Sequence, residues 1–526
     1  MNELLTSSLL WRFFAAFAAL LSRSPIGRFF RYLGALWRGS ATYRFFAHLF
    51  CAEPVADRSA YRRLLDRCNA ALYRLGRPLL PLLQDSAVRR VYGRFLHALR
   101  ESFLIGRLFS GGMTSFLLLI IAAYAPIDYL LRALHIASLA SLWDEALMVL
   151  CLLWIVYQRM TSKEPLRSRA NAVDVWLSGY LLAGVILLLF TVTNYLSVNI
   201  TGYRASMEYI LMFFLVTRLL RDDGDMLLLY RAMILIAFVF ALHGIWQFVV
   251  GVEIPDTWTD QAETAVRTRV FSIFKNPNIM GGYMVLFAPM AIGMAYASER
   301  PAEKVFYWIC GLCMCLACLF TMSRGAWLAL AVAAVLFALI VDRRLFGLML
   351  VAGIAACFLP FVRSRIGYLF TPQFAESNER GGRAKRWQTA LGYVDEYHAW
   401  TCGLGYGMYG GAVAVQNKVN PMFDYMYVDN YYVKILAENG IAGLTAFLSA
   451  IAGLLWGGLR ACGLAGSKER KPLCAGMLAG LVGILIHSLF ESLWEEPYMM
   501  ALFFSVAAML IFAGFLNRKP AANQTP

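Results

Sequence analysis

Apolar runs long enough to cross a lipid bilayer follow one another along most of this 526-residue chain, and they limit its fold more than any other feature. They recur between residues 108 and 516, and a run of about 20 apolar residues spans the hydrocarbon core as a helix. Charged residues make up only 15% of the chain, against about 25% in soluble domains. Because a spanning segment must satisfy its own backbone hydrogen bonds, the sequence predicts an all-α, polytopic membrane helix bundle.

Hydropathy windows predict about 12 transmembrane helices, with a large outer loop between helices 9 and 10. The predicted spans are residues 109–130, 141–157, 173–193, 205–220, 226–250, 277–297, 304–322, 324–341, 345–362, 431–458, 473–492 and 497–516. The loop at residues 363–430 is longer than a simple connection needs, so we predict a functional, catalytic role for it.

Basic residues in the short loops indicate the orientation. Each connection predicted to face the cytoplasm carries Arg or Lys, as the positive-inside rule requires. Both termini are therefore predicted to be cytoplasmic, with residues 108–516 as the transmembrane domain and residues 517–526 as a cytoplasmic tail.

Residues 1–107 hold 17 Arg, no Lys and six acidic residues, which is +11 of the chain's formal charge of +15. These basic residues are interleaved with Trp, Phe and Leu, a pattern typical of helices that lie on an anionic membrane surface. We predict a basic cytoplasmic or interfacial helical region, with an interfacial helix at residues 8–21. The pattern favours membrane lipids as partners and argues against nucleic acid.

The 11 cysteines lie mainly in apolar spans or in the N-terminal region, which argues against a disulfide framework. Cys310, Cys313, Cys315 and Cys318 resemble a metal-binding motif, but on a helix they point along two faces and are predicted to pack as small apolar residues. Neither a metal site nor a cofactor is predicted.

The most informative charges are basic residues in segments predicted to lie outside, because positive charge there opposes the topology. Guanidinium groups match phosphate oxygens in a bidentate geometry, so the pattern favours a phosphate-bearing substrate. Pairing with acidic side chains or lipid headgroups is the alternative. These basic residues are Arg267, Arg269, Lys275, Arg324, Arg363, Arg365, Arg380, Arg383, Lys385, Arg386 and Lys418.

Five motifs follow one another in the second half of the chain. They are RVFSIFKNPNIMGGY (269–283), SRG within TMSRGAWLAL (321–330), GRAKRWQTAL (382–391), GLGYG (403–407) and DNYYVKILAENGIAGL (429–444). Their order resembles the O-antigen ligase / O-antigen polymerase superfamily of bacterial membrane glycosyltransferases. The resemblance covers about residues 170–516 and leaves residues 1–107 outside.

The resemblance implies a metal-independent glycosyltransferase of the bacterial cytoplasmic (inner) membrane, acting at its outer face in surface polysaccharide assembly. It would transfer or polymerise glycan from a polyprenyl-pyrophosphate-linked donor onto a hydroxyl of a glycan or glycolipid acceptor. Arg324 and Arg383 match the arginines of the motifs, which implies that they hold the pyrophosphate and stabilise the leaving group. The residues predicted to bind substrate are Arg269, Lys275, Asn278, Arg386 and Asn430.

One position departs from the family's pattern. Ligases of the family usually carry His followed by Asn where this chain has Asp429–Asn430, which fits polymerase-like relatives better than a lipid A–core ligase. Asp429 is predicted as the catalytic base, and helix capping is the alternative role for the pair. His487 and Glu491, one helical turn apart near a predicted outer membrane face, are possible secondary site residues.

Two other functions remain open. A protein O-glycosylation ligase would use the same donor chemistry. A polysaccharide-lipid transporter or flippase would typically show inverted repeats and sites near the bilayer midplane, and the sequence shows neither.

Overall fold

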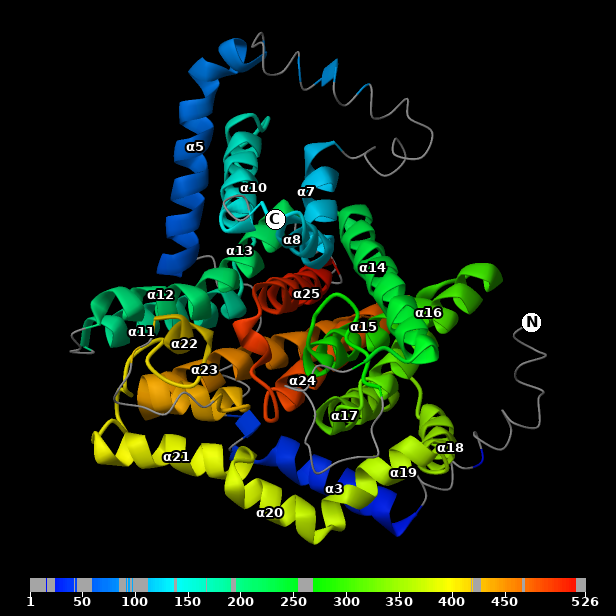
Figure 1. The fold of residues 1–526 in the computed structure, drawn as a ribbon. Helices are drawn as coiled ribbons and strands as arrows, with labels where there is room; N and C mark the ends of the chain where they lie inside the picture. The colour runs from blue at the N-terminus through cyan, green and yellow to red at the C-terminus, as the bar shows by residue number, and fades with distance from the viewer. Residues whose placement is uncertain are drawn as a thin grey trace.

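The computed structural model describes residues 16, 24–41, 43–44, 59–84, 91, 93–94, 97, 112–136, 140–166, 168–190, 195–253, 268–417, 419, 427–465 and 469–516. Within these residues the regular elements are all helices (Figure 1). The predicted tail at 517–526, and all but one residue of the predicted interfacial helix at 8–21, lie outside the described residues.

The helices are numbered along the chain as in Figure 1. The first half contains α3 (Pro25–Gly39), α5 (Ala60–Gln84), α7 (Met113–Ala122), α8 (Tyr124–Ala133), α10 (Trp143–Met160), α11 (Ala172–Phe190), α12 (Leu196–Met207), η1 (Glu208–Ile210), α13 (Leu211–Leu219) and α14 (Asp223–Val250). The second half contains α15 (Pro277–Ala297), α16 (Pro301–Phe320), α17 (Arg324–Ile340), α18 (Leu345–Cys357), α19 (Pro360–Gly367), η3 (Tyr368–Phe370), α20 (Pro372–Arg380), α21 (Arg383–Glu396), α22 (Ala412–Asn417), α23 (Tyr431–Leu464), α24 (Arg470–His487), η4 (Leu493–Glu495) and α25 (Pro497–Leu516).

Seven described helices are long and apolar enough to cross a membrane: α11, α14, α15, α16, α23, α24 and α25. The pairs α7–α8 and α18–α19 are bent by 69° and 84°, and they raise the number to nine if each pair is one span. The chain is therefore an all-helical, multi-pass membrane protein. The predicted number of 12 is not confirmed, because the predicted span at 205–220 is divided among α12, η1 and α13 and α10 carries Asp144, Glu145 and Arg159.

Three helices, α15, α24 and α25, form the buried centre of the bundle (Figure 1). Glycines on α24 allow close contact between α24 and α15. A Cβ atom at Gly480 would lie 2.2 Å from the carbonyl oxygen of Leu286, and one at Gly476 would lie 2.6 Å from that of Pro289. Gly476 and Gly480 form a GxxxG pair, the spacing that lets two membrane helices approach backbone to backbone.

The outer helices expose their apolar side chains. Most residues of α18 are exposed, and Leu189 on α11 and Val249 on α14 are each 77% exposed. In a soluble protein such surfaces would promote aggregation, whereas in a membrane they face lipid chains.

Helix α23 is broken at Gly440, whose φ of 64° lies in the left-handed region. The break leaves backbone groups without partners inside the helix, and the loop at residues 400–405 satisfies them. Leu404 N donates to Ala437 O at 2.8 Å, and Ile441 N donates to Trp400 O at 2.8 Å. The GLGYG motif thus has a structural role, since its backbone completes the interrupted helix.

The long segment between α18 and α23 is largely helical. Helices α20 and α21 lie across one end of the core helices (Figure 1), and α21 packs against α23. Because α15, α16 and α17 run alternately up and down, the first turns of α15 and α17 lie at this same end, as does the start of α23.

Helix α5, from the basic N-terminal region, is docked onto the end of α10 and the segment that follows it. Asn69 donates to Leu166 O at 2.9 Å, and Ser168 N donates to Asp66 Oδ1 at 2.8 Å. A Cβ atom at Gly76 would lie 2.2 Å from Met160 O, so the two helices touch closely.

We predict that deleting residues 1–107 weakens placement in the membrane and leaves the glycan transfer that the family resemblance implies largely intact in detergent. None of the described residues of this region lines the cavity described below, and its charge suits an anionic lipid surface. Transfer by the purified truncated protein, and its binding to vesicles with and without anionic lipid, measure the two effects. A well-folded truncated protein that no longer transfers would contradict the prediction.

Candidate functional site

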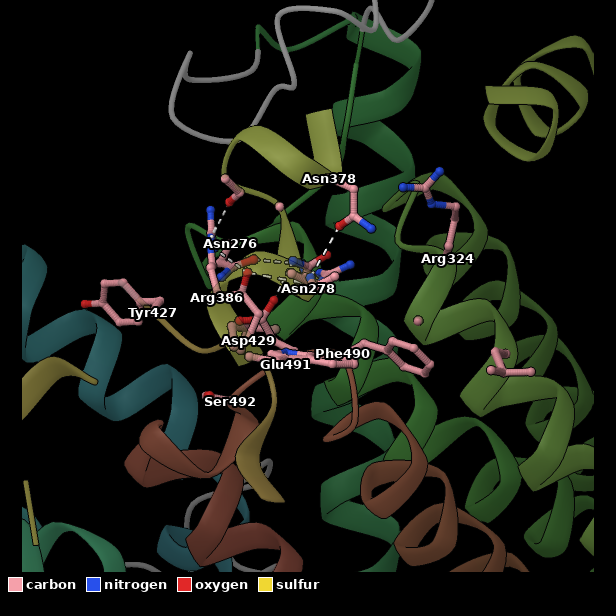
Figure 2. A pocket seen from close by; sticks show the side chains of 18 of the residues that line it. Asn276, Asn278, Arg324, Asn378, Arg386, Tyr427, Asp429, Phe490, Glu491 and Ser492 are labelled. Atoms are coloured by element: carbon pink, nitrogen blue, oxygen red, sulfur yellow. Dashed lines mark hydrogen bonds and ion pairs between the residues drawn. The ribbon is translucent and has the colours of Figure 1, made fainter. Parts of the chain in front are cut away.

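A large cavity lies at the end of the bundle where α15, α17 and α23 begin. Its volume is about 1310 Å³, above the roughly 300–1,000 Å³ of typical small-molecule pockets. Its walls come from residues 269–279, the first turns of α17, the region from α19 to α21, residues 427–429 and the turn between α24 and α25. Segments that are far apart in the sequence therefore meet at one site (Figure 2).

The cavity wall is rich in charge. Four carboxylates line it: Asp429, Glu491, Glu495 and Glu496. Five guanidinium groups also line it: Arg269, Arg324, Arg365, Arg383 and Arg386. This excess of planar, multidentate donors suits an anion with several oxygen atoms.

Four helices begin at the cavity, and their first turns add to its positive potential. Asn276 caps α15, Ser323 caps α17 and Asn430 caps α23, each through a side-chain oxygen that accepts a backbone N–H. The fourth, α21, begins directly at Arg383. The remaining free N–H groups of first helical turns carry partial positive charge and attract anions.

Three of these helices share an unusual backbone turn. The residue before each cap has a positive φ: 57° at Lys275, 55° at Met322 and 51° at Asp429. Non-glycine residues in such conformations cost about 1–3 kcal/mol each and cluster at functional sites. The Lys275 side chain itself is exposed and does not line the cavity, although the sequence predicted it to bind substrate.

Asp429 is paired with the two arginines of α21. Arg386 Nη1 donates to Asp429 Oδ2 at 2.6 Å, and Arg383 Nε lies 3.9 Å from the same oxygen. The pKa of Asp429 is raised, because burial outweighs the opposing effects of Arg386 and Arg383. Arg383 Nε is itself buried and has no hydrogen bond within the described chain.

Arg324 lies on another side of the cavity, at the start of α17 (Figure 2). Its guanidinium carbon is 5.3 Å from the ring centre of Phe374 and 6.0 Å from that of Tyr368, and its Nη1 donates to Arg365 O at 3.5 Å. Arg365 is fixed in turn, because its Nε donates to Met322 O at 3.0 Å. The structure thus lines one cavity with Arg324 and Arg383, the two arginines that the sequence predicted as catalytic.

Glu491 belongs to a chain of polar groups on the floor of the cavity. The buried Arg269 donates through Nη2 to Asn278 Oδ1 at 3.1 Å, and Asn278 Nδ2 donates to Glu491 Oε2 at 2.5 Å. Burial lowers the pKa of Arg269 to about 10. Burial, with a further contribution from Asp429, raises the pKa of Glu491 to about 7.

Two predicted residues lie beside the cavity without lining it. Asn430 is buried and caps α23, accepting hydrogen bonds from Tyr432 N at 3.0 Å and Val433 N at 3.2 Å. His487 is buried at the end of α24, and Cβ atoms at Gly282 and Gly325 would each lie 3.2 Å from its ring. These two glycines leave room for the imidazole ring between α15 and α17.

The sequence did not predict a buried ion cluster behind the cavity wall. Lys434 Nζ lies 2.6 Å from Glu495 Oε1 and 3.9 Å from Glu438 Oε2. Ala412 N donates to Glu495 Oε2 at 3.2 Å, and a Cβ atom at Gly411 would collide with Glu495. The spacing of Lys434 and Glu438, one helical turn apart, was the available signal for this pair.

Other lining residues were also missed, chiefly Asn276, Tyr427 and Glu496. Arg365 had been recognised only as one of several outer basic residues. Within the described residues, no group of three or more His, Cys, Asp or Glu side chains is arranged to hold a metal ion.

Comparison with known proteins identifies one family. The family model described as O-antigen ligase matches residues 309–448, about a quarter of the chain. This region runs from α16 to the first part of α23, so it supplies Arg324, Arg383, Arg386 and Asp429. No curated protein matches the chain. Residues 309–448 of this chain are therefore similar to the O-antigen ligase family.

Proposed function

We propose that this protein transfers or polymerises glycan from a polyprenyl-pyrophosphate-linked donor onto an acceptor hydroxyl at the outer face of the cytoplasmic membrane. The observation that carries the proposal is the cavity, in which five arginines and the first turns of four helices surround one space at one end of a membrane bundle. The donor's pyrophosphate is the anion that this positive wall would bind.

The wall next to Arg324 supports a donor with a lipid tail. Leu328 lies one helical turn after Arg324, and Leu369 and Phe374 line the same side of the cavity. A polyprenyl chain can leave past these apolar residues toward the lipid-exposed α18, while its pyrophosphate stays with the arginines. A fully water-soluble nucleotide sugar has no use for such an apolar wall.

The proposed chemistry needs two contributions from the protein. Arg324 and Arg383 would stabilise the negative charge that develops on the departing pyrophosphate. A cavity carboxylate would accept the acceptor's proton. Asp429, which lies beside Arg383, and Glu491, whose pKa is raised to about 7, are the two candidates. Under this proposal the arginines supply the charge stabilisation, and no metal takes part.

The test uses the purified full-length protein in lipid nanodiscs, with lipid-linked glycan extracted from the membranes of its host. We expect the donor to be consumed and free polyprenyl pyrophosphate to appear, as measured by mass spectrometry of the lipids. A matched sample with heat-inactivated protein is the control. Donor that crosses the bilayer of a vesicle without losing its glycan would contradict the proposal and favour a flippase.

A further inference from the structure

The two carboxylates at the centre of the cavity differ in what surrounds them (Figure 2). Asp429 Oδ2 accepts a hydrogen bond from Arg386 and faces Arg383 at 3.9 Å. Its backbone turns the chain into α23. Asp429 therefore holds the two arginines of α21 against the start of α23, and its Oδ2 is engaged in these charged contacts.

Glu491 has a different environment. Within the described chain, no Lys or Arg nitrogen lies within 4.0 Å of its carboxylate, and its one hydrogen bond comes from the neutral amide of Asn278. That bond occupies Oε2. The other oxygen, Oε1, accepts no hydrogen bond from the described residues, and Glu491 lines the cavity.

The orientation of Asn278 follows from its other partner. A guanidinium can only donate, so the bond from Arg269 fixes the amide oxygen of Asn278 toward Arg269. The NH₂ group must then point to Glu491, which fixes Oε2 of that carboxylate and leaves Oε1 as the oxygen that can accept a proton. The arrangement places a fixed acceptor next to an anion-binding wall.

We infer that Glu491 is the general base of the proposed transfer reaction, that Asn278 positions it, and that Asp429 positions the arginines. This inference rests on the proposed function and assigns the proton transfer within it.

In the reaction, the acceptor's hydroxyl oxygen forms a bond to the anomeric carbon of the donor glycan. The bond from that carbon to the pyrophosphate oxygen breaks, and its electron pair leaves with the polyprenyl pyrophosphate. The acceptor's proton moves to Glu491 Oε1, and Glu491 later releases it to water in the cavity. No oxidant, reductant or metal is needed for this balance.

The charges that face Glu491 come from four segments. Arg383 on α21 and Arg269 before α15 favour its ionised form, and Asp429 and Glu495 oppose it. Together with burial, which is the largest cause, these charges give Glu491 a pKa of about 7. A base with that value is about half ionised at neutral pH and can still take up a proton during the reaction.

The experiment measures turnover of lipid-linked donor from about pH 5 to about pH 9 for wild type, Glu491→Gln and Asp429→Asn. We expect Glu491→Gln to lower kcat by about 10²–10⁴-fold, with binding of glycan-free polyprenyl pyrophosphate nearly unchanged. In Asp429→Asn the fall of activity at acid pH should persist and move to lower pH, because the negative charge that raises the Glu491 pKa is gone. Glu396→Gln, at the exposed end of α21 and outside the cavity, is the matched control.

Two further variants test the positioning and guard against misfolding. Asn278→Ala removes a hydrogen bond to the ionised carboxylate, so the acid limb of the pH profile should move up by about one unit. Glu491→Asp keeps a carboxylate and should retain more activity than Glu491→Gln. If Glu491→Gln fails to elute as a monodisperse protein, an unshifted acid limb in Asn278→Ala overturns the inference.

The possible results separate the inference from the function on which it rests. Wild-type turnover in Glu491→Gln, or an inactive Asp429→Asn beside an active Glu491→Gln, would overturn the role of Glu491 and leave the transfer reaction standing. Wild-type protein that neither binds polyprenyl pyrophosphate nor consumes the donor would refute the proposed function itself, and the role of Glu491 with it.

Discussion

Replacing Arg383 by Lys should lower glycan transfer by about 10²–10³-fold, which is the usual cost of removing one preorganised donor from a developing anion. Arg383 is the first residue of α21, its side chain is 39% exposed in the cavity, and its buried Nε has no hydrogen bond within the described chain. Lysine keeps the positive charge but loses the planar fork that can bridge two phosphate oxygens. The loss should appear mainly in kcat, because the charge develops as the pyrophosphate departs.

The same substitution at other positions separates an effect on the leaving group from a general effect of replacing arginine by lysine. Arg363→Lys, on α19, alters an exposed arginine that does not line the cavity and should leave transfer unchanged. Arg386→Lys should lie between the two, because Arg386 is already engaged with Asp429 and with Gly381 O. Near-normal turnover in Arg383→Lys would show that this arginine does not stabilise the leaving group.

The sequence predicts the fold best where it depends on local composition. The apolar runs correctly indicated α11, α14, α15, α16, α23, α24 and α25, because crossing a membrane is a property of about 20 consecutive residues. Prediction from sequence failed where tertiary contacts determine the backbone conformation. The break at Gly440 is stable only because the loop at 400–405 supplies partners for its backbone, and no hydropathy window detects that.

The site residues also fall into those that the sequence predicted and those that only the tertiary structure shows. Arg324, Arg383 and Asp429 were predicted from sequence, and the structure brings them to one cavity. Their roles remain proposals. The pairing of Asn278 with Glu491 joins residues 213 positions apart in the sequence, and it depends on α15 and α24 packing through glycines. Asn430 caps α23, the alternative role that the sequence had left open, and His487 is enclosed beside the cavity.

The buried ion cluster behind the cavity yields the largest expected change in stability. The Lys434 side chain is 8% exposed and that of Glu438 3% exposed, so both charges have lost most of their hydration. Removing one partner of a buried pair leaves an uncompensated charge and costs about 3–5 kcal/mol. Among the described residues, Lys434 is the only cation within 4.0 Å of both Glu438 and Glu495, so its removal leaves two acids without a counter-charge.

Lys434→Met should therefore lower the midpoint of thermal unfolding in detergent by several degrees. Intrinsic tryptophan fluorescence measures the unfolding. The matched control is Lys471→Met, at the exposed start of α24, which should change the midpoint little. The double variant Lys434→Met/Glu495→Gln should recover part of the loss, because it removes one of the two uncompensated carboxylates. Since Glu495 also holds Ala412 N at the cavity wall, Lys434→Met should weaken binding of polyprenyl pyrophosphate as well.

An unchanged midpoint in Lys434→Met would mean that the cluster is hydrated in the membrane and contributes little to the stability of the fold.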